Sequence, residues 1–290
     1  MIKNLVFEGG GVKGIAYGGA LIALEQKGIL DNVTRVAGTS AGAITAVLLA
    51  CGYTAVELSE IVAETDFNKF KDDSFGAIRD FNRLMNNYGW HEGDYFTQWI
   101  GELIARKLDM PSDITFSDLR AMWGTRDLYL TATNLSKQRV EVFSAEHTPN
   151  VEIRHAARMS MGIPFYFEAI KHGPDEDIMV DGGVSYNYPI DIFDGFCPED
   201  ETLGFRVDSP DEIRYDGAAP IEINGILDFA GAVVGFLQVQ ANKKHLKSAD
   251  KARTVFIDTG SVKATDFDLS EQQVATLLAA GKQAVERYGL

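Results

Sequence analysis

Cysteine is scarce in this chain of 290 residues, which contains only Cys51 and Cys197. Neither lies at metal-ligand spacing from other suitable side chains, so the sequence predicts neither a disulfide framework nor a zinc site. Long hydrophobic runs are also missing, since no apolar stretch approaches the ~18 residues that a membrane-spanning helix needs. The chain enters a strand directly after Met1-Ile2-Lys3-Asn4, which leaves no room for a signal peptide. We therefore expect a cytoplasmic protein, peripheral to a membrane at most.

Basic residues are outnumbered by acidic ones. The chain has 27 Lys and Arg residues and 42 Asp and Glu residues, for a formal net charge of −15. This balance argues against nucleic acid as a partner, since phosphate binding requires a basic face. Hydrophobic residues make up 46% of the chain, enough for a core without metals or disulfides.

Strands alternate with helices along the whole chain, and neither an internal repeat nor a Ser-, Pro- or Gly-rich linker divides it. The predicted helices lie over residues 54–66, 94–108, 151–161 and 270–288, and the predicted strands include 128–133 and 140–143. We expect one domain over residues 1–290, a doubly wound three-layer α/β/α sandwich with a central, mostly parallel sheet.

The most informative stretch is Gly38-Thr39-Ser40-Ala41-Gly42, between a predicted strand over 33–37 and an apolar helix over 43–51. In that setting, G-x-S-x-G is typical of a nucleophile elbow, a sharp strand-to-helix turn that exposes a serine. The two glycines leave room for the turn, and the helix start places positive potential at the Ser40 hydroxyl. A structural turn that contains a serine would give the same pattern.

A glycine-rich stretch, Gly9-Gly10-Gly11-Val12-Lys13-Gly14, follows the predicted strand over 5–7. Such a loop presents several backbone N–H groups to one point, which suits an anion or a developing oxyanion. Its spacing also fits the dinucleotide fingerprint G-x-G-x-x-G, which requires an acidic residue at the end of the second strand. The nearby acid, Asp31, precedes that strand, which leads to Ser40 instead. A P-loop is excluded because no Gly-Lys-Ser/Thr follows.

A third stretch, Asp181-Gly182-Gly183, follows a predicted strand over 177–180. An aspartate at the carboxyl end of a strand lies at the edge where open α/β sheets bind their ligands. Ser40 reaches the same edge on its own strand, so the two side chains are predicted to meet there. An Asx turn is the alternative explanation for Asp followed by Gly.

In this order, the three stretches resemble the motifs of the patatin-like phospholipase family, as do Ala156-Ala157-Arg158 and Ile163-Pro164-Phe165. The resemblance extends from about Leu5 to Pro189, and Lys13 matches a basic position of the family. It implies a Ser-Asp dyad, acyl esters of phospholipids or lysophospholipids at a membrane surface as substrates, and no metal or other cofactor. The site residues that it implies are Ser40 as nucleophile, Asp181 as base, Gly9, Gly10, Gly11 and Gly14 in the oxyanion loop (Gly10 and Gly11 above all as N–H donors), and Gly38, Gly42, Gly182 and Gly183 as motif glycines.

Two other functions remain open. An α/β-hydrolase esterase would use Ser40, Asp181 and His245 as a triad in that chain order. Against it, Ser40 follows the second strand, which is early for that fold, and His245 lies on a charged helical face. The other alternative is a protein that binds an anion or nucleotide at the glycine loop and catalyses nothing. The head group of a lipid substrate and the oligomeric state are not defined by the sequence.

Two further segments have competing interpretations. Residues 67–90 interleave aromatic and basic side chains, which would suit a lid or a lipid-facing patch, although we favour a helix packed on the edge of the sheet. The apolar segment 226–239 would suit an acyl groove, but an interior helix is preferred. His155 and Ser160 lie on the predicted helix over 151–161, and we expect both to have structural roles.

Overall fold

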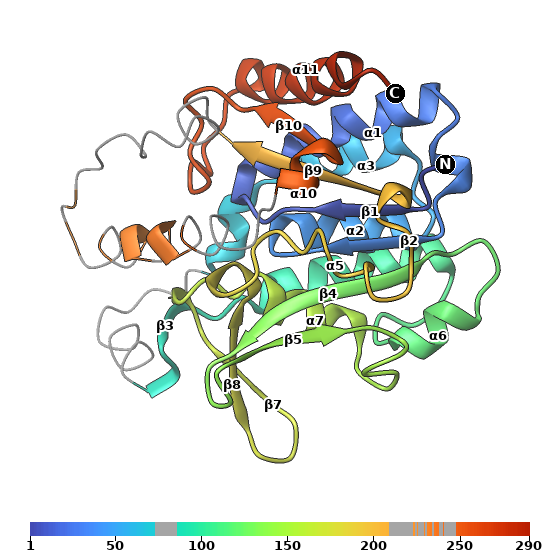
Figure 1. The fold of residues 1–290 in the computed structure, drawn as a ribbon. Helices are drawn as coiled ribbons and strands as arrows, with labels where there is room; N and C mark the ends of the chain where they lie inside the picture. The colour runs from blue at the N-terminus through green and yellow to red at the C-terminus, as the bar shows by residue number, and fades with distance from the viewer. Residues whose placement is uncertain are drawn as a thin grey trace.

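The computed structural model describes residues 1–72, 86–208 and 248–290, together with isolated positions between 223 and 240. Its centre is an eight-stranded sheet (Figure 1) with the order β10-β9-β1-β2-β4-β8-β7, and β5 pairs with β4. The strands of this sheet are β1 (Asn4–Phe7), β2 (Arg35–Gly38), β4 (Asp127–Asn134), β5 (Arg139–Phe143), β7 (Ile170–His172), β8 (Asp177–Asp181), β9 (Thr202–Asp208) and β10 (Thr254–Asp258). A separate parallel pair consists of β3 (Gly89–His91) and β6 (Phe165–Phe167).

The strands from β10 through β4 pair in parallel, whereas β5 and β8 run antiparallel to β4. β1 lies in the middle and its Leu5, Val6 and Phe7 are fully buried, as expected for a parallel strand that is covered on both faces. The mostly parallel α/β sheet that the sequence predicts is confirmed.

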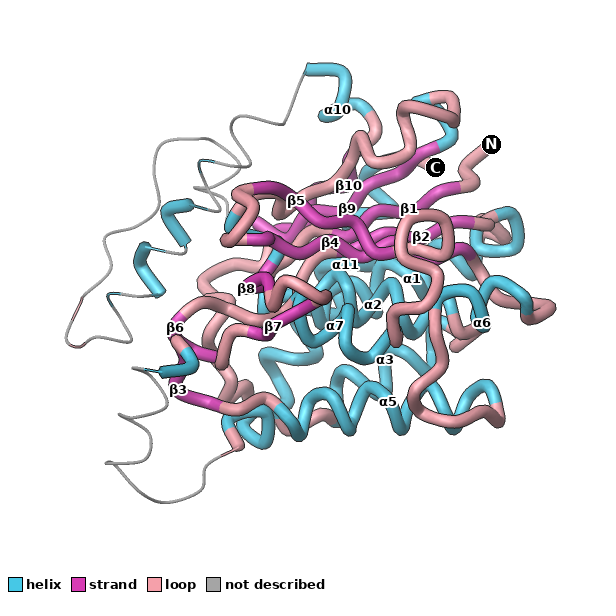
Figure 2. The backbone as a smooth tube through the Cα atoms, turned by 90° about the horizontal axis from the view of Figure 1, so that it is seen from below, coloured by secondary structure: helices cyan, strands magenta, loops and turns pink. Residues whose placement is uncertain are grey.

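Most helices cover one face of the sheet, as Figure 2 shows. α2, the apolar helix predicted after Ser40, packs directly on β1, β2 and β4, while α1 packs between α3 and α11. The helices are α1 (Ala16–Gln26), α2 (Ala41–Ala50), α3 (Ala55–Glu64), α5 (Asp94–Leu108), α6 (Phe116–Ala121), α7 (Ile153–Ser160), α10 (Ser248–Ala252) and α11 (Glu271–Tyr288). The 3-10 helices are η1 (Gly11–Ile15), η2 (Leu30–Asn32), η3 (Phe67–Lys71), η4 (Gly182–Val184) and η5 (Glu199–Glu201). Capping boxes begin α3 at Thr54 and α11 at Ser270, at the starts of the helices predicted over 54–66 and 270–288.

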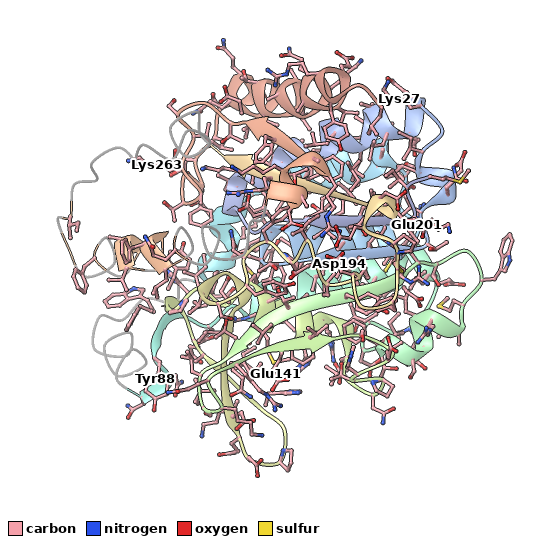
Figure 3. The ribbon with its side chains drawn as sticks, viewed as in Figure 1. Lys27, Tyr88, Glu141, Asp194, Glu201 and Lys263 are labelled. Atoms are coloured by element: carbon pink, nitrogen blue, oxygen red, sulfur yellow. The ribbon has the colours of Figure 1, made fainter. Side chains whose placement is uncertain are left out.

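An irregular segment over 186–197 covers the other face of the sheet. Its Tyr188, Ile190 and Phe193 pack on Val6, Ala37 and Tyr129. An ion-pair cluster fixes its far end, because Arg253 binds both Asp194 oxygens at 2.6 Å and Asp250 at 2.8 Å. Figure 3 labels Asp194 near the middle of the molecule. This segment immediately follows the Asp181 turn, so its packing also determines where Asn187 lies.

The two segments with competing interpretations are only partly described. Phe70 of η3 is buried and packs on Phe96 and Trp99 of α5, with ring centroids 5.3 and 5.2 Å apart. The start of 67–90 thus packs on a helix and not on the sheet edge, while residues 73–85 lie outside the described residues. In 226–239, the described Phe229 and Phe236 are 54% and 63% exposed, so an interior helix is wrong for these positions.

His245, the third member of the alternative triad, lies outside the described residues. Within the described residues, no helix combines the length and apolar character needed to cross a membrane.

Candidate active site

Ser40 occupies the sharp turn between β2 and α2. Its φ of 52° and ψ of −121° are strained for a residue with a side chain, a conformation that costs about 1–3 kcal/mol and is typical of functional turns. A Cβ atom on Gly38 would lie 2.1 Å from the Gly42 carbonyl oxygen, and one on Gly42 would lie 2.3 Å from the Phe7 carbonyl oxygen. Both motif glycines are therefore required for close backbone approach, and the turn has the predicted strand-turn-helix geometry.

Ser160 contacts this turn directly. Its hydroxyl, fully buried at the end of α7, accepts the backbone N–H of Ser40 at a distance of 3.0 Å. The structural role that the sequence predicts for Ser160 agrees with this contact. The Ser160 hydroxyl is the polar group that satisfies the N–H of the strained Ser40 turn, and the two residues lie 120 positions apart in the chain.

Asp181 ends β8 and is fully buried. Its backbone N–H donates to the Gly162 carbonyl at 2.8 Å, its carbonyl accepts the Thr133 hydroxyl at 2.9 Å, and its Oδ1 accepts the Gly183 N–H at 2.6 Å. A Cβ atom on Gly182 would lie 2.5 Å from the Thr131 carbonyl oxygen. Gly182 thus permits close packing on β4, and Gly183 supplies the donor that orients the carboxyl group. This is the Asx-type turn of the alternative interpretation, and it aims the carboxyl group inward.

The carboxyl group of Asp181 is unusually basic. Burial raises its pKa to about 7, against the opposing effects of the Gly183 N–H and of the adjacent Ser40 hydroxyl. Oδ2 is buried and has no completed hydrogen bond within the described part of the chain. The structure therefore places the Ser40 hydroxyl beside the Asp181 carboxyl group, in which Oδ2 is the oxygen without a hydrogen bond in the described residues.

Among the described residues, two adjacent amides of the glycine loop have no acceptor. The Gly9 N–H donates to the Asn187 carbonyl at 3.1 Å, and the Val12 N–H donates to the Ala264 carbonyl at 3.0 Å. The N–H groups of Gly10 and Gly11 donate to no acceptor in the ranges that the structure describes. Two neighbouring free amides at the start of a helical segment form an anion-binding arrangement.

Gly9 and Gly14 provide the space for close packing of the glycine loop. A Cβ atom on Gly9 would lie 3.1 Å from the Ser40 Cβ, and one on Gly14 would lie 3.0 Å from the Ala41 Cβ. The glycine loop therefore packs directly on the nucleophile turn, which the sequence predicts only through the family resemblance.

A buried ion pair lies beneath the glycine loop. Arg206 of β9 and Glu8 are 3.3 Å apart (Nε to Oε1), with side chains only 5% and 2% exposed. Glu8 also accepts the Val207 N–H and the Asn187 amide at 3.1 and 3.2 Å. The sequence alone indicates no role for Glu8, because its partners come from β9 and from the 186–197 segment, far along the chain.

The two basic residues of the family resemblance are both buried. Lys13 lies within η1, two residues after Gly11. Arg158 of α7 donates through Nη2 to the carbonyls of Glu92 and Glu168, at 2.7 and 3.0 Å, and burial lowers its pKa to about 10. Arg158 thus holds the segments around β3 and β6, and these contacts give it a positioning role.

An apolar cavity of ≈ 50 Å³ opens beside Ser40 and Gly11. Its walls come from α2, α3, η3, the residues after α7 and the loop before α11, and they include Ile44, Val62, Phe70, Ile163 and Phe267. Polar side chains are few in this lining. Across the described residues, no group of three His, Cys, Asp or Glu side chains is arranged to hold a metal ion.

A serine on a strained strand-to-helix turn, beside a basic carboxyl group and free amides, defines a hydrolase site on an α/β fold. Residues 5–194 match the family model described as patatin-like phospholipase, so the chain belongs to this family of hydrolases. The resemblance on which the sequence analysis relied is thereby confirmed.

The chain is also similar to individual proteins and to a solved structure. Protein YqhO of Bacillus subtilis (strain 168) is 31% identical over 295 residues, which cover 98% of this chain and 96% of that protein. Probable lipid hydrolase 463L of Invertebrate iridescent virus 6 is 30% identical over 197 residues, 66% of this chain and 62% of its own length. The crystal structure of VipD from Legionella pneumophila has a TM-score of 0.67 at 20% identity, covering 99% of this chain and 66% of VipD. The chain therefore spans just under two thirds of VipD, and this likeness shows the fold alone.

Proposed function

We propose that this protein is a lipid acyl hydrolase of the phospholipase A or lysophospholipase type, which cleaves carboxyl esters through an acyl-enzyme on Ser40. The observation that carries the proposal is the basic carboxyl group of Asp181 beside Ser40, with Oδ2 uncommitted in the described part of the chain. A carboxylate with a pKa of about 7 is a far better base at neutral pH than an ordinary aspartate, whose pKa is about 3.9.

The reaction follows from this arrangement. Ser40 Oγ attacks the ester carbonyl while Asp181 accepts its proton, a step for which a positioned base contributes about 10²–10⁴ in rate. The N–H groups of Gly10 and Gly11 stabilise the oxyanion, each worth about 10²–10³. Collapse of the intermediate breaks the bond to the alcohol, which takes the proton from Asp181. Water then attacks the acyl-enzyme, Asp181 accepts and returns a proton, and the fatty acid is released.

The apolar cavity supports a lipid substrate. It begins at Ser40 and is lined by aliphatic and aromatic side chains, which suit an acyl chain and would leave the charges of a nucleotide unpaired. A related viral protein bears the name of a lipid hydrolase. We infer that the first carbons of the acyl chain of a phospholipid or lysophospholipid, presented at a membrane surface, enter this cavity.

Fluorophosphonate labelling and hydrolysis of p-nitrophenyl esters test the proposal. We expect wild type to be labelled and active, Ser40→Ala to be neither, and Asp181→Asn to lose activity by a factor of about 10³. Ser117 of α6, whose hydroxyl bonds to the Thr115 hydroxyl and which is not part of the cavity lining, supplies a matched control, and Ser117→Ala is expected to match wild type.

Two outcomes would replace the proposal. A wild-type protein that is never labelled and hydrolyses no ester would favour the anion-binding alternative. A loss of about a thousandfold in His245→Ala would favour the triad, whereas unchanged activity in that variant would exclude it.

A further inference from the structure

The loop over residues 259–269, which connects β10 to α11 and is here called the strap, contacts the glycine loop. Its Ala264 carbonyl accepts the N–H of Val12 at 3.0 Å. Gly11, whose φ is +54°, packs against the same peptide group, since a Cβ atom there would lie 2.0 Å from the Ala264 oxygen. The strap therefore fixes the backbone on the C-terminal side of the two free amides. Figure 3 labels Lys263 in this strap.

The strap also forms part of the cavity wall. Phe267 lines the cavity together with Tyr166, and the two rings stack with centroids 5.7 Å apart and an interplanar angle of 29°. Tyr166 follows α7, which carries Ser160. The stacked pair thus connects the strap to the elements that surround the nucleophile.

A third contact joins the strap to η3. Asp268 Oδ1 accepts the side-chain amide of Asn68 at 2.6 Å. Asn68 lies between Phe67 and Phe70, which both line the cavity. The strap therefore contacts the cavity from two sides.

The strap holds its own shape through a local turn. Asp266 Oδ2 accepts the Lys263 N–H at 2.8 Å, and the Asp266 N–H donates to the Lys263 carbonyl at 3.1 Å. The Phe267 N–H donates to the Thr265 carbonyl at 2.9 Å. These bonds fix Ala264 relative to Phe267, so displacement of one end of the turn is passed to the other.

We propose that the strap is a positioning and specificity element that couples occupancy of the cavity to the geometry of the oxyanion donors. Phe267 packs against the acyl chain and thereby favours long chains over short ones, while Ala264 holds Gly11 and Val12 in the conformation that presents the free amides. The inference rests on the proposed hydrolase function. It goes beyond the family motifs, because the strap lies outside the residues 5–194 that match the family model.

Two substitutions separate the two roles. Phe267→Ala removes the wall, so kcat/KM is expected to fall about tenfold for p-nitrophenyl palmitate and less than twofold for p-nitrophenyl butyrate. Asp266→Ala loosens the turn that carries Ala264, so kcat is expected to fall about tenfold for both esters with little change in KM, together with slower fluorophosphonate labelling. Asp266→Asn keeps an acceptor for the Lys263 N–H and is expected to restore kcat.

Controls make the result decisive. Phe196→Ala removes an exposed aromatic ring that packs on Phe193, outside the cavity, and is expected to match wild type with both esters. Thermal unfolding checks that each variant is folded, and Phe267→Leu replaces Phe267→Ala if the latter is not. If wild type is inactive and unlabelled, the proposed function fails. If wild type is active but the Phe267 and Asp266 variants stay within twofold of it on both esters, the strap inference alone is overturned.

Discussion

The hydroxyl of Ser160 accepts the backbone N–H of Ser40 over 3.0 Å, so the conformation of the Ser40 turn depends on a residue from another helix. Ser40 has a positive φ that only a few side chains tolerate. A buried N–H in such a turn would cost about 1–3 kcal/mol if it lacked an acceptor. Ser160 therefore stabilises the turn and fixes the direction of the Ser40 side chain.

Removal of this acceptor is predicted to lower turnover more than substrate binding. Ser160→Ala is expected to reduce kcat about tenfold with little change in KM, because the serine hydroxyl loses its fixed direction toward Asp181. Steady-state kinetics with one ester measures both constants. Ser160→Cys preserves the side-chain volume but is a weak acceptor, so it is expected to resemble Ser160→Ala. Lower thermal stability with an unchanged kcat would show that Ser160 has only a structural role.

The pH dependence of hydrolysis is predicted to report Asp181. Only the ionised carboxylate can accept the Ser40 proton, and burial raises its pKa to about 7. The value of kcat/KM is therefore expected to rise tenfold per pH unit below about pH 7 and to level off above it. A profile from pH 4 to pH 9 measures the midpoint. A rate that is already constant above about pH 5 would contradict a buried aspartate base.

The same shift predicts a pH-dependent free energy of unfolding. The pKa of Asp181 is about 7 when folded and near 3.8 when unfolded, so between these values the folded state binds more protons than the unfolded state. This group therefore makes the fold progressively less stable as pH rises from about 4 to about 7. Asp181→Asn removes the titration and is expected to be more stable than wild type at pH 8 by a few kcal/mol, on the order that the shift implies. Denaturant unfolding at pH 5 and pH 8 measures the difference in the free energy of unfolding between Asp181→Asn and wild type. A difference that is the same at both pH values would refute this prediction.

Alanine variants of the neighbouring glycines Gly10 and Gly11 are predicted to differ in whether a second substitution restores their activity. A Cβ atom on Gly10 would lie 2.4 Å from Val207 Cγ2, a side-chain atom, whereas one on Gly11 would lie 2.0 Å from a backbone oxygen. Both single alanine variants are expected to lose most of their activity. Gly10→Ala combined with Val207→Ala should recover activity, because the obstructing methyl group is gone. Gly11→Ala combined with Ala264→Gly should not recover, since the carbonyl and the positive φ remain. Ester hydrolysis by the four variants checks both statements.

The nucleophile turn was predictable because its constraints are local. The glycines on either side of Ser40, a strand before it and an apolar helix behind it all lie within a few residues, and the structure confirms this geometry. The residues that support the turn were not predictable in this way. Ser160, Arg206 and Ala264 act through contacts that only the folded chain brings together, and their local sequence resembles that of ordinary helix, strand and loop residues.

The position of Asp181 was predicted by reasoning that holds only in part. The sequence predicts that Ser40 and Asp181 lie at the carboxyl ends of two strands and meet at one edge of the sheet, which is the arrangement that parallel strands give. β8 instead runs antiparallel to β4, with Asp181 opposite Ala132. Gly38, at the end of β2, is opposite Leu130. Asp181 thus reaches the level of Ser40 from the other direction, because β4 continues past the end of β2.

Because Asp181 pairs with this extension of β4, the position of its carboxyl group beside Ser40 depends on the register of three residue pairs between β8 and β4. Asp181, Val180 and Met179 are opposite Ala132, Thr133 and Asn134, and successive side chains of a strand point to opposite faces. A slip of β8 by one position would turn the carboxyl group to the far side of the sheet with every residue of the site still present. The antiparallel pairing of β8 with β4, and not the parallel part of the sheet, therefore sets the distance between the Asp181 carboxyl group and the Ser40 hydroxyl.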